Sequence, residues 1–193
     1  REHIEQLPSV SSNRLQESIL AQLEAFENGI DAMDEAVTKN LQNFVRAINK
    51  ENLYAMETFS WQKPLRAVEF GQWAIRLIEV FGENKYLKSY CRGFLRDIYK
   101  YLINAEVILG RFENAAKYFE ELKEQMQKQY EYHQSILSDE AEKAKFNDRQ
   151  IGYMEAYTQE FIKEKQQDVV NYILGCWPGK MAEKFAEAIG YSK

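Results

Sequence analysis

The sequence predicts an all-α protein, and three observations carry that prediction. Apolar residues recur at intervals of three and four along most of the chain, a spacing that places them on one face of an α-helix. Only three prolines and nine glycines occur in 193 residues, so few positions can break a helix. No segment shows the strict alternation of apolar and polar residues that marks a half-buried strand. We therefore expect seven or eight helices, arranged as antiparallel hairpins.

The N-terminal part is expected to form one long helix or a hairpin. Residues 1–12 contain a proline and three serines, and we expect them to be a poorly ordered lead-in. Residues 13–50 keep the helical spacing, but the pattern leaves open whether Gly29 bends one helix or ends it before a second. The apolar register shifts after Ile48, and this shift predicts a helix boundary at residues 50–52.

A helical hairpin organises the middle of the chain, within a segment of helical hairpins expected over residues 52–137. Its two amphipathic halves cover residues 86–137 and meet at Gly110, where the first helix needs a left-handed C-terminal residue. The connection is short enough to make the two helices antiparallel. Upstream of this hairpin, Pro64 suits the first position of a helix better than its interior.

The C-terminal part predicts one long helix and one short helix. The long helix is expected within residues 147–177, and Asn147 with Gln150 forms a possible capping box at its start. A capping helix is expected over residues 179–190, with an apolar face made of Met181, Phe185 and Ile189. Together, residues 13–193 are expected to form a single all-helical domain.

The corner of the central hairpin has a distinctive order of residues. A glycine is followed by an aromatic residue two positions later, an alanine three positions after that, and a second aromatic residue four further on: Gly110, Phe112, Ala115 and Phe119. This order resembles the middle of a tetratricopeptide repeat, and Leu102 falls where that family has a leucine in its first helix. The resemblance implies stacked helical hairpins that offer a groove or face to another polypeptide. An irregular helical bundle with the same corner remains the alternative.

Charge and cysteine content limit the classes of partner and compartment. The net charge is −5 and the pI is near 5.3, so we expect this chain not to bind nucleic acid directly or to attach to an anionic membrane. No apolar run reaches the length of a membrane span. The two cysteines are far apart and form no CxxC pair, which favours a reducing, cytoplasmic location. Because the chain begins with Arg1, we expect it to be a piece of a longer protein.

Few residues are available for catalysis or metal binding. His133 lies on an apolar stripe and is expected to be a packing residue, and His3 lies in the lead-in. Cys91 is expected in the core, whereas Cys176 is expected to be partly exposed. Neither a phosphate-binding glycine loop nor a nucleophile elbow is present. We therefore expect no enzyme activity, cofactor or metal.

Aromatic residues are the strongest indication of a binding surface. The chain has 12 Tyr, 11 Phe and 3 Trp, and eight of these lie off or at the margins of the apolar stripes: Tyr54, Trp61, Tyr99, Tyr101, Tyr118, Tyr132, Tyr153 and Tyr172. Amphipathic aromatic side chains of this kind either line a protein-binding groove or fill a second buried face of a helix. As contact residues we predict Trp61, Tyr99 and Tyr118, for a peptide, a partner helix or a second copy of the chain.

A second function class remains open at the C-terminus. Residues 185–193 resemble the first helix and turn of a helix-turn-helix motif, whose recognition helix would lie beyond Lys193. The alternative function is therefore the sensing or dimerisation region of a transcription regulator, with its DNA-binding part outside this chain. A helical bundle that binds a small ligand in its core is a third possibility.

Overall fold

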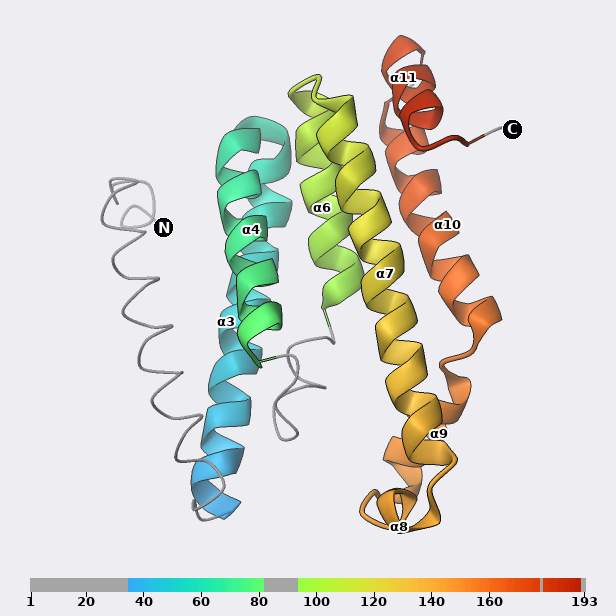
Figure 1. Ribbon diagram of the computed structural model, residues 1–193. Helices are drawn as coiled ribbons and strands as arrows, with labels where there is room; N and C mark the ends of the chain where they lie inside the picture. Colours follow the sequence, from blue (N-terminus) through green and yellow to red (C-terminus); the bar gives the residue numbers. More distant parts are fainter. Residues whose placement is uncertain (1–34, 82–93, 178, 192–193) are drawn as a thin grey trace. The chain divides into compact units, whose positions relative to one another are not determined.

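The computed structural model describes residues 35–81, 94–177 and 179–191. These ranges contain eight helices and no strand, so the all-α prediction is confirmed for them (Figure 1). The lead-in expected at residues 1–12 and the question of Gly29 lie outside the described residues. No helix in the described part of the chain is both long enough and apolar enough to cross a membrane.

The chain consists of two compact units, and the boundaries between them fall inside two helices. These helices are α3 (Glu35–Gln62) and α4 (Pro64–Phe81). The second unit takes residues 56–68, at the junction of the two helices, together with the chain from Leu95 onward; the first unit takes the rest of both helices. The single domain expected for residues 13–193 stays a prediction.

α3 runs without interruption through residues 50–52, so the helix boundary predicted there is wrong. The apolar register does shift after Ile48, but α3 contains neither glycine nor proline, and nothing in its backbone ends the helix. The shift lies close to the point where α3 passes from one compact unit into the other. Only Lys63 separates α3 from α4, and Pro64 occupies the first position of α4 as predicted.

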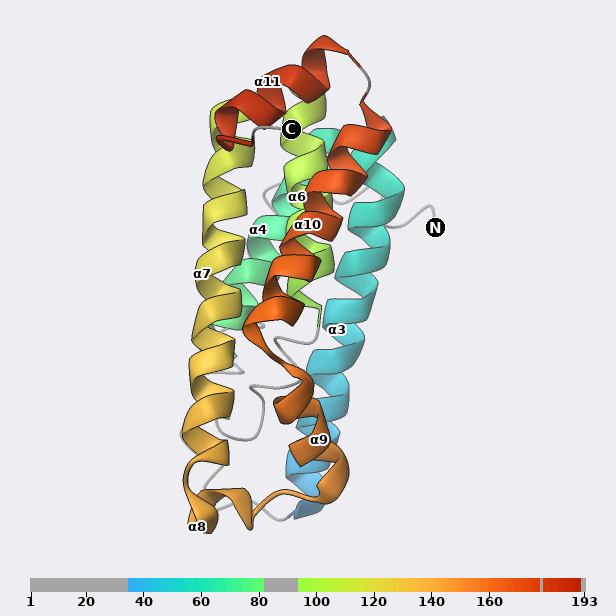
Figure 2. The same cartoon turned by 90° about the vertical axis from the view of Figure 1, so that its right-hand side faces the viewer.

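Three long helices form the core of the second unit. They are α6 (Leu95–Ile108), α7 (Phe112–Leu137) and α10 (Gln159–Cys176), and each contacts the other two (Figure 2). α6 and α7 form the antiparallel hairpin that the sequence predicts, while residues 86–93, the expected start of its first half, lie outside the described residues. The apolar faces of α6, α7 and α10 meet in a core whose fully buried side chains include Ile98, Leu102, Ala105, Leu122, Val169 and Ile173.

Two shorter helices follow α7 and pack against it. They are α8 (Glu140–Lys143) and α9 (Asp148–Ala156). The carboxylate of Asp139 caps α8 by accepting hydrogen bonds from two backbone amides. At the start of α9, Asn147 and Gln150 bond each other's backbone amides at 3.0 Å, so the predicted capping box is confirmed.

The single long helix expected within residues 147–177 is wrong, because the chain breaks between α9 and α10. Tyr157 has a non-helical backbone, and Thr158 then caps α10 by accepting a hydrogen bond from the backbone amide of Phe161 at 3.1 Å. The apolar spacing continues through this break because Tyr157 is itself buried. α10 ends at Cys176, where the sequence predicts its end.

The last helix, α11 (Lys180–Ala188), packs against the beginning of α7 and against α10. Phe185 is its fully buried side chain, so the inward position predicted for this residue is confirmed. Gly190 has a φ of 64° and ends the helix in a left-handed turn. The next residue, Tyr191, is held against α10 because its hydroxyl accepts a hydrogen bond from Gln167 Nε2 at 3.0 Å.

The corner between α6 and α7 is a Schellman turn centred on Gly110. Gly110 has a φ of 71°, and its amide donates to the carbonyl oxygen of Val107 at 3.0 Å. The amide of Arg111 reaches further back and donates to the carbonyl oxygen of Glu106 at 2.9 Å. The left-handed residue expected at Gly110 is therefore confirmed, and these bonds satisfy carbonyl groups that the end of α6 leaves open.

Replacing Gly110 with alanine is expected to lower the free energy of unfolding by about 1–2 kcal/mol, measured by chemical unfolding and circular dichroism. A Cβ atom at this position meets nothing within 4 Å, so the cost comes from the positive φ alone. The matched control is Gly152→Ala inside α9, where a Cβ also meets nothing within 4 Å. This control is expected to gain about 0.5–1 kcal/mol. Equal effects of the two substitutions would contradict the role of the turn.

Candidate partner-binding site

Four aromatic side chains meet at one place in the second unit, and we call them the aromatic cluster: Trp61, Tyr101, Tyr172 and Trp177. Trp61 lies in the last turn of α3, and its ring stacks on that of Trp177, with centroids 5.2 Å apart and an interplanar angle of 30°. Tyr101 of α6 meets Tyr172 of α10 edge to face at 6.2 Å. The geometry is that of favourable aromatic pairs.

The pairs also show how α6 and α10 run. Tyr101 faces Tyr172, and Asn104, one turn later on α6, bonds Trp177 at the end of α10. Both helices therefore run in the same direction past each other. This parallel arrangement follows from the chain path, because α7 returns antiparallel to α6 and α10 turns back again.

Hydrogen bonds fix both indole rings of the cluster. Trp177 Nε1 donates to Asn104 Oδ1 at 2.8 Å, and Asn104 is fully buried. The indole N–H of Trp61 donates to the hydroxyl of Tyr172, which in turn bonds the thiol of Cys176 one turn further along α10. Each indole therefore has a partner for its N–H group as well as a ring to stack on.

Burial changes the acid–base behaviour of the two tyrosines. Burial, then the neighbouring Cys176, raises the pKa of Tyr172 to about 12. Burial and the carboxylate of Glu57, which bonds the Tyr101 hydroxyl, raise the pKa of Tyr101 well above its ordinary value. Both hydroxyls are protonated at neutral pH, and they bond Glu57 and Cys176, which lie next to the cluster.

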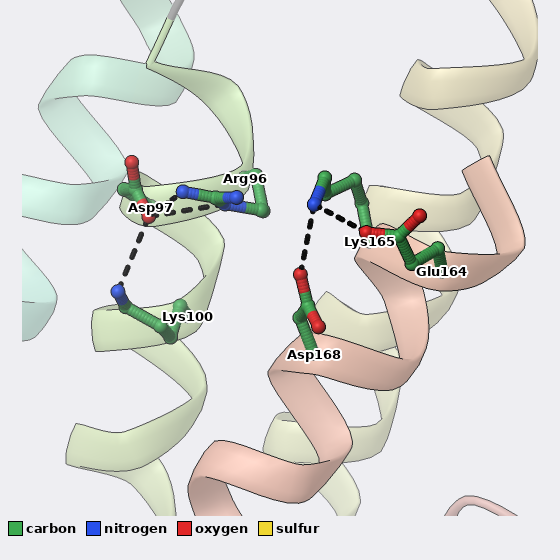
Figure 3. A network of polar contacts seen from close by, with 6 residues as sticks. All are labelled: Arg96, Asp97, Lys100, Glu164, Lys165 and Asp168. Atoms are coloured by element: carbon green, nitrogen blue, oxygen red, sulfur yellow. Dashed lines mark hydrogen bonds and ion pairs between the residues drawn. The ribbon is translucent and has the colours of Figure 1, made fainter. Parts of the chain in front are cut away.

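Charged side chains on α6 and α10 form a border next to Tyr101 and Tyr172, and Figure 3 shows the ion pairs of this border. On α6, Asp97 accepts hydrogen bonds from Arg96 Nη2 at 2.9 Å and from Lys100 Nζ at 3.2 Å. On α10, Lys165 Nζ lies 2.8 Å from Glu164 and 3.1 Å from Asp168. Each of these cations has a carboxylate partner, so the border carries little net charge.

Lys100 connects the charged border to the aromatic cluster. Its Nζ atom lies 4.6 Å from the ring centroid of Tyr101 and 5.1 Å from that of Tyr172. These distances are those of cation–π contacts, which hold both rings from one side. The cluster is therefore fixed on three sides by a cation, hydrogen bonds and stacking, while Trp61 stays 45 % exposed.

The structure separates the three contact residues that the sequence predicts. Trp61 belongs to the aromatic cluster. Tyr99 and Tyr118 contact each other between α6 and α7, with ring centroids 6.4 Å apart. Tyr99 and Tyr101 are two residues apart on α6, so they point to opposite sides of that helix. Tyr99 is only 2 % exposed, and we therefore do not include it in the surface proposed below.

His133 lies in a second aromatic group, where α7 meets α9. It is buried, as the sequence predicts, and its ring contacts those of Tyr132, Tyr153 and Tyr157 at centroid distances of 6.1, 5.8 and 5.0 Å. Such edge contacts join the two helices. No group of three His, Cys, Asp or Glu side chains placed to hold a metal occurs in the described ranges. Cys176 is partly exposed, as predicted, and Cys91 lies outside those ranges.

Sequence reasoning missed Asn104 and Lys100, which hold the aromatic cluster in place. Asn104 carries a detectable signal, because it is the single polar residue in the run Leu102-Ile103-Asn104-Ala105 and buried polar groups need partners. Lys100 carries none, since a lysine on a helix is usually solvated. No protein family, curated protein or solved structure matches this chain, so the site is interpreted from its own geometry.

Proposed function

We propose that this chain is a non-catalytic protein-interaction or scaffold module that binds a peptide, a helix or a second copy of itself at the aromatic cluster. Trp61 is the observation that carries the proposal. Its side chain is 45 % exposed and yet held by a stacked ring and a hydrogen bond. An aromatic side chain that is already ordered loses little conformational entropy when a partner covers it, which is the property of an interface anchor.

The electrostatics of the site favour a protein partner over a nucleic acid. The chain has a net charge of −5, and the cations Arg96, Lys100 and Lys165 all contact carboxylates. A surface that neutralises phosphates needs a concentration of unpaired positive charge. An exposed indole beside balanced charges instead has the composition of a protein interface, with an aromatic centre and a polar rim.

We also propose that the α6–α7 corner is a tetratricopeptide-type hairpin in a reducing, cytoplasmic protein. Ala115 is completely buried, which supports close approach of the two helices at the position where the family has a small residue. Phe119 is buried one turn later, and Gly110 supplies the left-handed corner. These positions support a scaffold role because stacked hairpins present extended surfaces to other polypeptides.

Alanine at Trp61 is expected to reduce capture of protein partners by about tenfold or more without lowering the helical content. The experiment immobilises the intact chain, quantifies the bound proteins by mass spectrometry, and records circular dichroism for each variant. Tyr153→Ala is the matched control, since Tyr153 is 53 % exposed but lies on α9 away from the aromatic cluster. Partners retained equally by Trp61→Ala and the wild type would contradict the proposal.

The same variants test the second-copy form of the proposal. If the partner is another copy of the chain, sedimentation of the wild type shows a concentration-dependent dimer, and Trp61→Ala shifts it toward the monomer. Tyr153→Ala is expected to sediment as the wild type does. A dimer that is unaffected by the loss of Trp61 would place self-association at another surface.

A further inference from the structure

In the side-chain amide of Asn104, the oxygen has a hydrogen-bond partner and the nitrogen has none among the described residues. The oxygen accepts the indole N–H of Trp177 at 2.8 Å, and because an indole nitrogen can only donate, the orientation of the amide is fixed. The amide nitrogen, Nδ2, then has no hydrogen-bond partner among the described residues. Asn104 is fully buried, so this unused donor has no access to solvent while Trp177 is in place.

A buried donor without a partner costs free energy, and this cost favours the binding of any group that supplies an acceptor. Leaving a polar group buried without a partner costs about 1–3 kcal/mol. A carbonyl oxygen placed on Nδ2 recovers this free energy, and Oδ1 can accept a second N–H at the same time. A secondary amide such as a peptide group carries both a carbonyl oxygen and an N–H.

Trp177 contacts the buried Asn104 from the point where the helical backbone of α10 ends. It is the first residue after α10, and its own backbone is not helical. Gly175 and Gly179 flank it, and Gly179 has a φ of 80°. The backbone amide of Trp177 donates to the carbonyl oxygen of Ile173 at 3.1 Å, which keeps its backbone on α10. Its side chain is held by the stack on Trp61 and the bond to Asn104, both of which a competing group can replace.

We propose that Trp177 is a displaceable cover of the binding site, and that the partner segment replaces it by placing an aromatic or indole side chain on Trp61 and a main-chain carbonyl on Asn104 Nδ2. This inference rests on the proposed function and names the chemistry that the same site recognises. The present occupant defines that chemistry, since Trp177 already shows that a flat ring with an N–H group fits between Trp61 and Asn104.

A polypeptide fits this site better than a nucleobase does. Both offer a flat ring with a donor and an acceptor, but a nucleobase in RNA or DNA brings a phosphate backbone. The charged groups that contact the cluster include the Lys100 ammonium, which already contacts Asp97, and the carboxylate of Glu57 at Tyr101. Neither provides an unpaired cation for a phosphate, whereas a neutral peptide group requires none.

The test uses N-acetyl-tryptophanamide, a small probe with an indole ring, two carbonyl groups and amide N–H groups. NMR of the full chain follows the side-chain amide of Asn104 and the indole N–H of Trp177 as the probe is added. The wild type is expected to show shifts at both groups. Trp177→Ala, which removes the cover, is expected to bind the probe about tenfold more tightly, because it no longer has to break the bond and the stack.

Three further samples complete the test. Asn104→Leu in the Trp177→Ala background is expected to lose most of this gain, and N-acetyl-leucinamide, which has no ring, is expected to bind at least several-fold more weakly. Trp177→Phe keeps a ring but no N–H group and is expected to bind with intermediate affinity. It serves in place of Trp177→Ala if that variant does not fold.

Several outcomes would overturn the inference. They are no shift in the wild type, weaker probe binding after Trp177→Ala, and unchanged binding after Asn104→Leu. A parallel titration with adenosine that gives larger shifts than N-acetyl-tryptophanamide would also overturn it, in favour of a nucleobase. Weaker binding after Trp177→Ala would make Trp177 a contact residue instead of a cover. In that case capture of partners through Trp61 is still expected, so failure of this inference is distinguishable from failure of the proposed function.

Discussion

Leu102→Ala is expected to lower the free energy of unfolding by about 3–5 kcal/mol. Leu102 lies in the middle of α6, is completely buried, and faces the core that α6 forms with α7 and α10. Its loss removes buried apolar surface and leaves a cavity that three packed helices cannot close. The measurement is chemical unfolding followed by circular dichroism, with amide exchange in α6 and α7 as a local readout.

The matched control is the same substitution at Leu65, in the first turn of α4, where the side chain is 55 % exposed. Leu65→Ala is expected to change the free energy of unfolding by no more than about 0.5 kcal/mol. A similar loss at both positions would mean that leucine content as such stabilises the chain. A small loss at Leu102 alone would mean that α6 is not the centre of the core.

The α6–α7 hairpin was predictable because its signals are local. Gly110 needs only its own φ to end α6, and the capping box of Asn147 and Gln150 spans four residues. The apolar residues of α6 recur at intervals of three and four, and this spacing identifies the face of the helix that is buried. Features of this kind depend only on residues that are close in the sequence, so they can be predicted without knowing the fold.

The errors arose where tertiary surroundings override the spacing. At residues 50–52 the register shift resembles a helix end, but the helix continues and enters a different compact unit. At Tyr157 the reverse occurs, because a buried aromatic residue keeps the apolar spacing intact while Thr158 begins a new helix. A threonine in an apolar pattern is a weak signal, since threonine also occurs inside helices.

The candidate site was predictable only in part. Trp61 was singled out because it lies outside an apolar stripe, and it is exposed. The contact between Asn104 and Trp177 was not predictable, since these residues are 73 positions apart and meet only because α6 and α10 run parallel. The tyrosines illustrate the same limit, because Tyr99 and Tyr101 have similar sequence surroundings and yet face different helices.

Phe185→Ala is expected to cost about 3–5 kcal/mol of the free energy of unfolding, because Phe185 is the fully buried anchor of α11. α11 has nine residues, too few for a helix to be stable in water by itself, so its amides are expected to exchange rapidly once the anchor is lost. Glu187→Ala, an exposed substitution on the same helix, is the control and is expected to change stability by no more than about 0.5 kcal/mol.

The stability of Phe185→Ala also discriminates between two functions. In a helix-turn-helix motif completed after Lys193, the apolar face of α11 would pack on the recognition helix, and Phe185→Ala would leave the stability of this chain nearly unchanged. A large loss instead shows that Phe185 packs on α7 and α10, and that α11 closes the end of this helical unit.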